Sequence, residues 1–201
     1  MPFYLDDIPA EPFVIEPPET IDLAAFTAAE ARLIDPAGVT VDLTASIDEE
    51  TNSIVAQQPA VSPYTVEGVH RLRVAVTSAT GRQQLPDIRL VVQDADSQWH
   101  TLDSVRAEWP DAEHIADATL WALLDLARTQ VVAFAPALVD EAPVPDRYRE
   151  GQRVQARNVW NATRVAPDGS TGQDDFIIRP FPMDWHVKSI LRPKRGIPVI
   201  G

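Results

Sequence analysis

The sequence predicts an α+β protein in which a β-sandwich domain precedes a smaller helical domain. Apolar residues recur with period two before about residue 100 and with period 3.6 after it. Eighteen prolines against eight glycines favour many extended segments and turns. With 201 residues, 45% of them apolar, the chain can bury a substantial core. We predict an extended arm at 1–20, a β-domain at 21–100, a helical domain at 101–179 and a C-terminal tail at 180–201.

The arm is inferred from composition. Residues 1–20 contain five prolines and five acidic residues and show no sustained apolar period. We expect an extended arm that becomes ordered only against something else.

Three segments carry the β prediction. The first, 39–47, reads as one half-buried strand whose inward residues are Val39, Val41, Leu43, Ala45 and Ile47. In the second, 68–76, one face holds His70, Leu72, Val74 and Val76, and the other face holds Arg71 and Arg73. The third spans 88–94, and turn sequences at 35–38, 78–81 and 94–97 separate such segments.

Short alternating strands at this spacing favour an antiparallel sandwich. The sequence GVHRLRVAV at 68–76 also resembles the Gly-x-aromatic-x-Leu-x-Val strand of immunoglobulin-like sandwiches, with His70 at the aromatic position. That resemblance implies an antiparallel immunoglobulin-like β-sandwich.

Four helices are expected after residue 100. An amphipathic helix begins near Asp117, its expected N-cap, and ends before Pro136. A shorter helix at 102–109 precedes it and is stopped by Pro110. A third occupies 144–164 with Pro145 in its first turn, and about two turns fit between Asp184 and Pro193.

Enzyme templates each fail on a specific requirement. There are no cysteines, which excludes disulfides, thiolate metal sites and thiol nucleophiles. The four histidines never occur at the i, i+4 spacing of a helical zinc site. The GSTG at 169–172 lacks the Gly-Lys-Ser/Thr ending of a phosphate loop, and no Gly-x-Ser-x-Gly elbow exists. We therefore expect a protein that is not an enzyme and uses no cofactor or metal.

Charge is distributed unevenly along the chain. Residues 1–145 hold 7 basic and 24 acidic residues, whereas 146–201 hold 10 and 6. This argues against nucleic-acid binding by the whole surface but permits head-to-tail contact between copies. No apolar run approaches the ~18 residues that span a bilayer, and no export signal is evident, so we expect a soluble protein without a membrane partner.

Two basic segments are candidate binding sites. Arg149, Arg153 and Arg157 recur every four residues on the 144–164 helix. This row can be a solvated face, can pair with the acidic body of a neighbouring copy, or can line a channel that carries DNA.

The second candidate is the tail. A two-turn helix is too short to be stable alone, so it must either fold back as core or dock on another protein, and docking is favoured. The expected docking residues are Phe181, Trp185, His186, Lys188, Ile190, Leu191, Arg192, Lys194 and Arg195.

From about residue 99 onward the ordered motifs resemble the head-to-tail adaptor (connector) proteins of tailed phages, particularly those that infect actinobacteria. The motifs are WHTLDSVRAEWPDA, a long helix ending in FAPAL, VPDRYREGQRVQARNVWNA, and DDFIIRPFPMDWHVKSILRPKRG. The resemblance covers about half of the chain.

The resemblance implies a structural virion protein of the neck, present in the host cytoplasm during assembly. It implies a ring of usually twelve copies beneath the portal protein, contacting the next connector or stopper protein, with DNA passing through without sequence-specific binding. Trp185 to Arg195 would reach the portal or a neighbouring subunit, and Arg149, Arg153 and Arg157 would face the lumen or a neighbour.

The β-domain departs from the compact adaptor pattern and leaves an alternative open. In that alternative the chain is a tail or baseplate component whose sandwich binds a host surface or carbohydrate. Such modules usually expose aromatic residues, and between 31 and 98 the only one is Tyr64, which favours the adaptor. A DNA-binding regulator is disfavoured by the net charge of -13.

Overall fold

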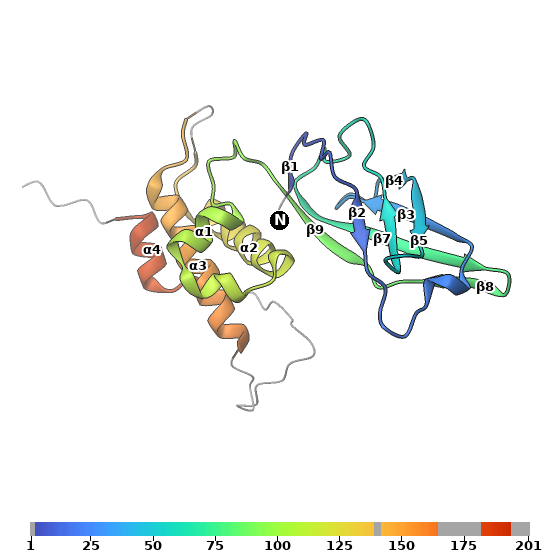
Figure 1. Ribbon diagram of the computed structural model, residues 1–201. Helices are drawn as coiled ribbons and strands as arrows, with labels where there is room; N and C mark the ends of the chain where they lie inside the picture. Colours follow the sequence, from blue (N-terminus) through green and yellow to red (C-terminus); the bar gives the residue numbers. More distant parts are fainter. Residues whose placement is uncertain (1–2, 139–141, 165–181, 194–201) are drawn as a thin grey trace, which may run out of the picture. The chain divides into compact units, whose positions relative to one another are not determined.

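The computed structural model describes residues 3–138, 142–164 and 182–193, and the chain divides into two compact units, 1–95 and 96–201 (Figure 1). The first unit is built of strands and the second of helices. The α+β class predicted from the sequence is therefore confirmed. Each unit has its own core.

The β-unit contains two sheets. The larger has the strand order β1 (Phe3–Tyr4), β9 (Ile88–Gln93), β7 (Gly68–Ser78), β3 (Ala28–Ile34) and β4 (Thr40–Leu43), with β8 (Gly81–Gln84) also paired to β7. The smaller has the order β2 (Phe13–Ile15), β6 (Ser53–Ala56) and β5 (Ala45–Asp48). Neighbouring strands are antiparallel except β1, which runs parallel to β9.

One hydrophobic core joins both sheets of the β-unit. Leu33 and Leu72 come from the larger sheet and Ile54 from the smaller, and all three are almost completely buried. The inward face predicted for 68–76 is confirmed, since His70 is fully buried. Its Nε2 lies 2.8 Å from the carbonyl oxygen of Val66, so the imidazole keeps a polar partner inside the core.

The prediction of one strand over 39–47 is wrong. The segment forms β4 and β5, which belong to different sheets, and Val39 is 62% exposed. The chain changes sheet at Thr44, whose carbonyl accepts a hydrogen bond from the Gln57 amide at 2.8 Å. Side-chain alternation reports which residues share a face, but it does not report which neighbour a strand pairs with.

The segment predicted as an arm supplies two strands to the β-unit. β1 pairs with β9, and β2 pairs with β6. The ring of Phe3 stacks on Tyr64 with centroids 4.8 Å apart, so the segment also contributes to packing.

The helical unit contains α1 (Leu102–Glu108), a 3-10 turn η2 (Pro110–His114), α2 (Asp117–Phe134), α3 (Asp146–Arg164) and α4 (Trp185–Leu191). These elements confirm the four predicted helices within one or two residues at each end. Thr101 and Ser104 form a reciprocal capping box that starts α1. The apolar stripe predicted for α2 is confirmed, because its buried residues are Leu120, Leu123, Leu124, Ala127 and Val131.

Asp117 is not the N-cap of α2, contrary to the prediction. The cap position is Ala116, which makes no side-chain hydrogen bond. Asp117 instead accepts a hydrogen bond from Arg106 at 2.6 Å, and this ion pair links α1 to the first turn of α2. A carboxylate in the first turn still interacts favourably with the helix dipole.

Candidate functional site

The short helix α4 is fixed to α3 by Asp184. One carboxylate oxygen accepts the Val187 amide at 2.8 Å and caps α4, while the other accepts the Asn158 side-chain amide at 3.1 Å. One side chain therefore both starts α4 and attaches it to α3. Fixing the helix in this way offsets the poor stability of a two-turn helix on its own.

Glycine on α3 allows α4 to pack closely. A Cβ atom at Gly151 would lie 2.7 Å from Cδ2 of Leu191, which is closer than real Cβ atoms approach another atom. Leu191 and Val187 are both fully buried, in a cluster with Tyr148. Leu191, predicted to dock on a partner, thus packs inside its own unit.

The opposite side of α4 is solvent-facing. Trp185 is 79% exposed, and its ring meets that of His186 edge-on with centroids 6.0 Å apart. Lys188 and Arg192 are exposed and extend over the Phe134 ring of α2, at 5.9 and 4.7 Å from its centroid. These cation–π contacts hold two positive charges over Phe134.

The remaining predicted docking residues divide into two groups. Ile190 is partly buried at the edge of α4. Phe181, Lys194 and Arg195 lie outside the described residues. The site therefore consists of the exposed aromatic and basic residues of α4 and its C-cap, namely Trp185, His186, Lys188 and Arg192, which we call the α4 face.

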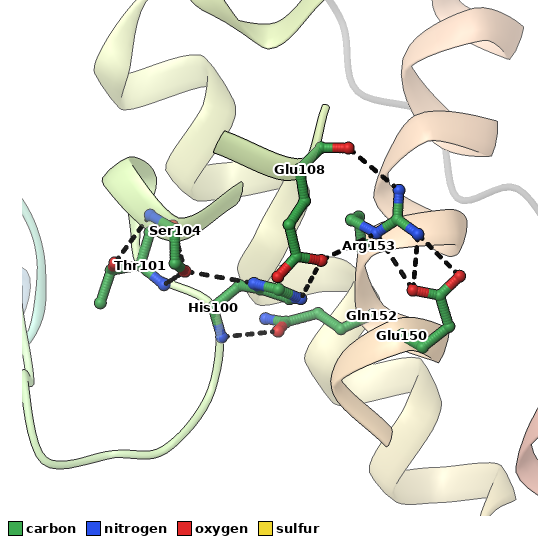
Figure 2. Close-up of polar contacts among 7 residues, drawn as sticks. All are labelled: His100, Thr101, Ser104, Glu108, Glu150, Gln152 and Arg153. Carbon is green, nitrogen blue, oxygen red and sulfur yellow. Dashed lines mark hydrogen bonds and ion pairs between the residues drawn. The ribbon is translucent and has the colours of Figure 1, made fainter. Parts of the chain in front are cut away.

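The predicted arginine row on α3 does not form one uniform surface. Arg153 is tied into its own unit: its guanidinium donates to Glu150 at 2.6 to 3.1 Å and to the Glu108 carbonyl at 3.2 Å (Figure 2). Arg149 is partly buried, and its Nε has no hydrogen-bond partner among the described residues. Arg157 is exposed and alone keeps a solvent-facing position.

Arg153 borders a buried polar cluster between α1 and α3 that sequence reasoning missed. The side chain of His100 is 1% exposed; its Nδ1 lies 3.1 Å from Oγ of Ser104 and its Nε2 lies 3.9 Å from the Glu108 carboxylate (Figure 2). Its backbone amide donates to Gln152 on α3 at 3.1 Å. The four-residue steps from His100 to Ser104 to Glu108 were a signal that could have revealed the cluster.

Burial lowers the pKa of His100, because desolvation penalises the charged imidazolium. The Glu108 carboxylate acts in the opposite direction, while Arg149 and Arg153 lower the pKa further. Burial and the two arginines therefore favour the neutral imidazole.

The cluster is suited to holding helices together rather than to catalysis. The Ser104 hydroxyl accepts the Thr101 amide at 2.9 Å and donates to the Thr101 carbonyl at 3.2 Å, so capping occupies it. The imidazole is enclosed, which leaves no room for a substrate beside it. Over the described ranges, no group of three or more His, Cys, Asp or Glu side chains could hold a metal ion.

In the described part of the chain, no helix combines the length and apolarity needed to cross a bilayer. Comparison with protein-family models finds no match to this chain, and comparison with curated proteins finds no significant match either.

Proposed function

We propose that the protein is a structural, non-enzymatic virion protein of a tailed phage: a head-to-tail adaptor in the neck. It forms a ring, of twelve copies by the resemblance, beneath the portal protein and contacts the next connector or stopper protein. DNA passes through the ring without sequence-specific binding.

The observation that carries this proposal is the exposed indole on an anchored helix. Trp185 is 79% exposed, yet its helix is fixed by Asp184, Asn158 and Leu191. Burying an indole of about 200 Å² against a partner is worth about 4 kcal/mol, so an exposed one is expensive unless it has a partner. Because the helix is preorganised, docking costs little additional ordering.

The basic residues of the α4 face support a protein partner with an acidic rim. Lys188 and Arg192, which lie over Phe134 and belong to the same exposed segment as Trp185, would steer the helix during encounter. A central aromatic anchor with charged neighbours is the usual composition of an interaction hot spot.

For the β-unit we propose an immunoglobulin-like sandwich that decorates the outside of the ring. The alternative, a tail or baseplate component that binds a host surface or carbohydrate through this unit, has less support. Carbohydrate-binding faces usually expose aromatic rings, whereas Tyr64, the only aromatic residue between 31 and 98, is fully buried.

The test is a binding measurement with the portal protein of the same phage. Wild-type protein should form a stoichiometric complex, and Trp185→Ala should weaken it about 30-fold, the loss expected when a hot-spot residue worth about 2 kcal/mol is truncated. Val61→Ala, in the β-unit and 78% exposed, is the matched control and should bind normally.

Electron microscopy of virions with gold-labelled antibody against the protein gives a second readout. Label at the neck is expected. Label only at the distal end of the tail would contradict the adaptor proposal. Unchanged portal binding by Trp185→Ala would contradict the role of the α4 face.

A further inference from the structure

All the basic residues of the β-unit lie on one face of one sheet. The unit has five arginines and no lysine, against fifteen acidic residues. The strand registers place the arginines together on the larger sheet: Arg32 opposite Arg73, Arg71 opposite Arg89, and Arg82 opposite Thr77. We call this surface the arginine face.

The face points away from the core. Along β7 the side chains of His70, Leu72 and Val74 are buried, so Arg71 and Arg73, which alternate with them, project from the opposite side. Like charges directly opposite each other across a strand pair destabilise the sheet. The arginine pairs are therefore not explained by the stability of the sheet.

Three of the five arginines are neutralised locally. Arg32 pairs with Asp42 at 2.9 Å, Arg73 with Asp87 at 3.1 Å and Arg82 with Glu30 at 3.1 Å. The three arginines and Glu30 line a hollow of about 210 Å³. The surplus charge therefore lies elsewhere on the face.

The surplus is the cross-strand pair Arg71 and Arg89. Both are exposed, and neither forms an ion pair within 4 Å in the described parts of the chain. The pKa of Asp87 is lowered mainly by its hydrogen bond with Arg73, and the charge of Arg71 helps to lower it only at longer range. Two adjacent guanidinium groups, rigidly spaced by the sheet, match a partner that presents two carboxylates.

The same unit presents such a pair of carboxylates on its other sheet. Asp48, Glu49 and Glu50 in the β5–β6 turn are the only three consecutive acidic residues in the chain. Asp48 is used internally, because it accepts the amides of Glu50 and Thr51 at 3.0 and 3.3 Å. Glu49 and Glu50 are exposed, with no ion pair to any described residue.

The turn is also rigid. Asn52 adopts a positive φ of 48°, and its side-chain oxygen accepts the Leu23 amide at 3.0 Å. The two free carboxylates are thus presented on a fixed hairpin tip, which reduces the ordering cost of binding.

We propose that the arginine face of one copy receives the acidic turn of a second copy, with Arg71 and Arg89 pairing to Glu49 and Glu50. The two surfaces differ, so the contact is head-to-tail and can repeat from copy to copy around a closed ring. This inference rests on the proposed ring, which supplies the second copy, and it names the β-unit contact within that ring.

The test measures self-association of the full chain by sedimentation at low and high ionic strength. Wild-type protein should associate at low ionic strength and dissociate as salt screens the pairs. Arg71→Gln/Arg89→Gln should weaken association about tenfold or more. Val61→Glu/Thr65→Glu lowers the net charge equally at exposed positions of another loop and should have little effect.

A charge-swap mixture makes the test specific. Arg71→Glu/Arg89→Glu and Glu49→Arg/Glu50→Arg should each associate poorly alone and should associate with each other when mixed. Thermal unfolding of each variant establishes that it is folded before it is compared.

Three outcomes would overturn the inference: a wild-type chain that stays monomeric at low ionic strength, a mixture that fails to associate, or Arg71→Gln/Arg89→Gln weakening only the binding of a short DNA duplex. Restored pairing in the mixture without binding to the portal would instead refute the proposed function and leave this contact standing.

Discussion

At the scale of single residues, the burial of His100 makes the free energy of unfolding depend on pH. The imidazole pKa is lowered first by desolvation, and the unfolded chain regains an ordinary value of about 6.5. As pH falls below that value, His100 is protonated in the unfolded state but stays unprotonated in the folded state. The contribution of His100 to the free energy of unfolding is therefore fully present above about pH 6.5 and is lost as pH falls toward the lower folded pKa.

Replacing His100 by Asn should remove this dependence. Between about pH 6.5 and the folded pKa, the free energy of unfolding of the wild-type helical unit should fall up to about 1.4 kcal/mol per pH unit more steeply than that of His100→Asn. Urea unfolding monitored by helical circular dichroism over this range provides the measurement. If the free energies of unfolding of the two proteins changed in parallel with pH, the pKa of His100 would not be lowered in the folded state.

At the scale of elements, predictions succeeded where the determining contacts are local. The α2 stripe and the inward face of β7 follow from periodicity within one segment, and both are confirmed. The split of 39–47 between two sheets was not predictable, because it depends on β4 pairing with β3 and β5 pairing with β6, which alternation does not report. Asp117 was misassigned because its partner, Arg106, lies on another helix.

In the candidate site, too, only the features that depend on local contacts could be predicted. A short helix with Trp185 on it was predictable from Asp184 and Pro193. The inward position of Leu191 was not, since it depends on Gly151, forty positions earlier in the chain. The engagement of Arg153 by Glu108 likewise requires knowing that this end of α1 lies beside α3, whereas its pair with Glu150 is an i,i+3 contact within α3.

Substituting Gly151 tests whether this close packing positions α4. Alanine improves helix propensity by about 1 kcal/mol, but its Cβ would overlap Leu191, and overpacking typically costs about 1–3 kcal/mol. Leu191 is fully buried and has little space to move. We expect Gly151→Ala to destabilise the helical unit slightly and to speed amide exchange in 185–191.

A double-mutant cycle provides the control. Leu191→Ala removes the atoms that the new Cβ would meet, so Gly151→Ala should be neutral or stabilising in that background. Equal effects of Gly151→Ala in both backgrounds would show that the two residues do not interact as described.

At the scale of the whole molecule, the chain combines two units with separate cores and different uses of charge. In the β-unit, Leu72 and Ile54 belong to one apolar cluster; in the helical unit, Val131 and Leu191 belong to another. The β-unit is acidic except on its arginine face, while the helical unit presents the α4 face. Two distinct contact surfaces on two units are what a chain needs if it must bind both its own copies and a different protein.

Separate cores also predict separate unfolding. Leu72→Ala removes a fully buried side chain from the β-unit and Leu124→Ala removes one from the helical unit, each at a cost of about 2–5 kcal/mol. Each substitution should lower the stability of its own unit and leave the other near its wild-type value. Hydrogen exchange followed by mass spectrometry at increasing denaturant assigns each opening to its peptides. A single transition that both substitutions shift equally would instead show that the two units fold as one cooperative body, and the β-unit could then not act as an independent contact module.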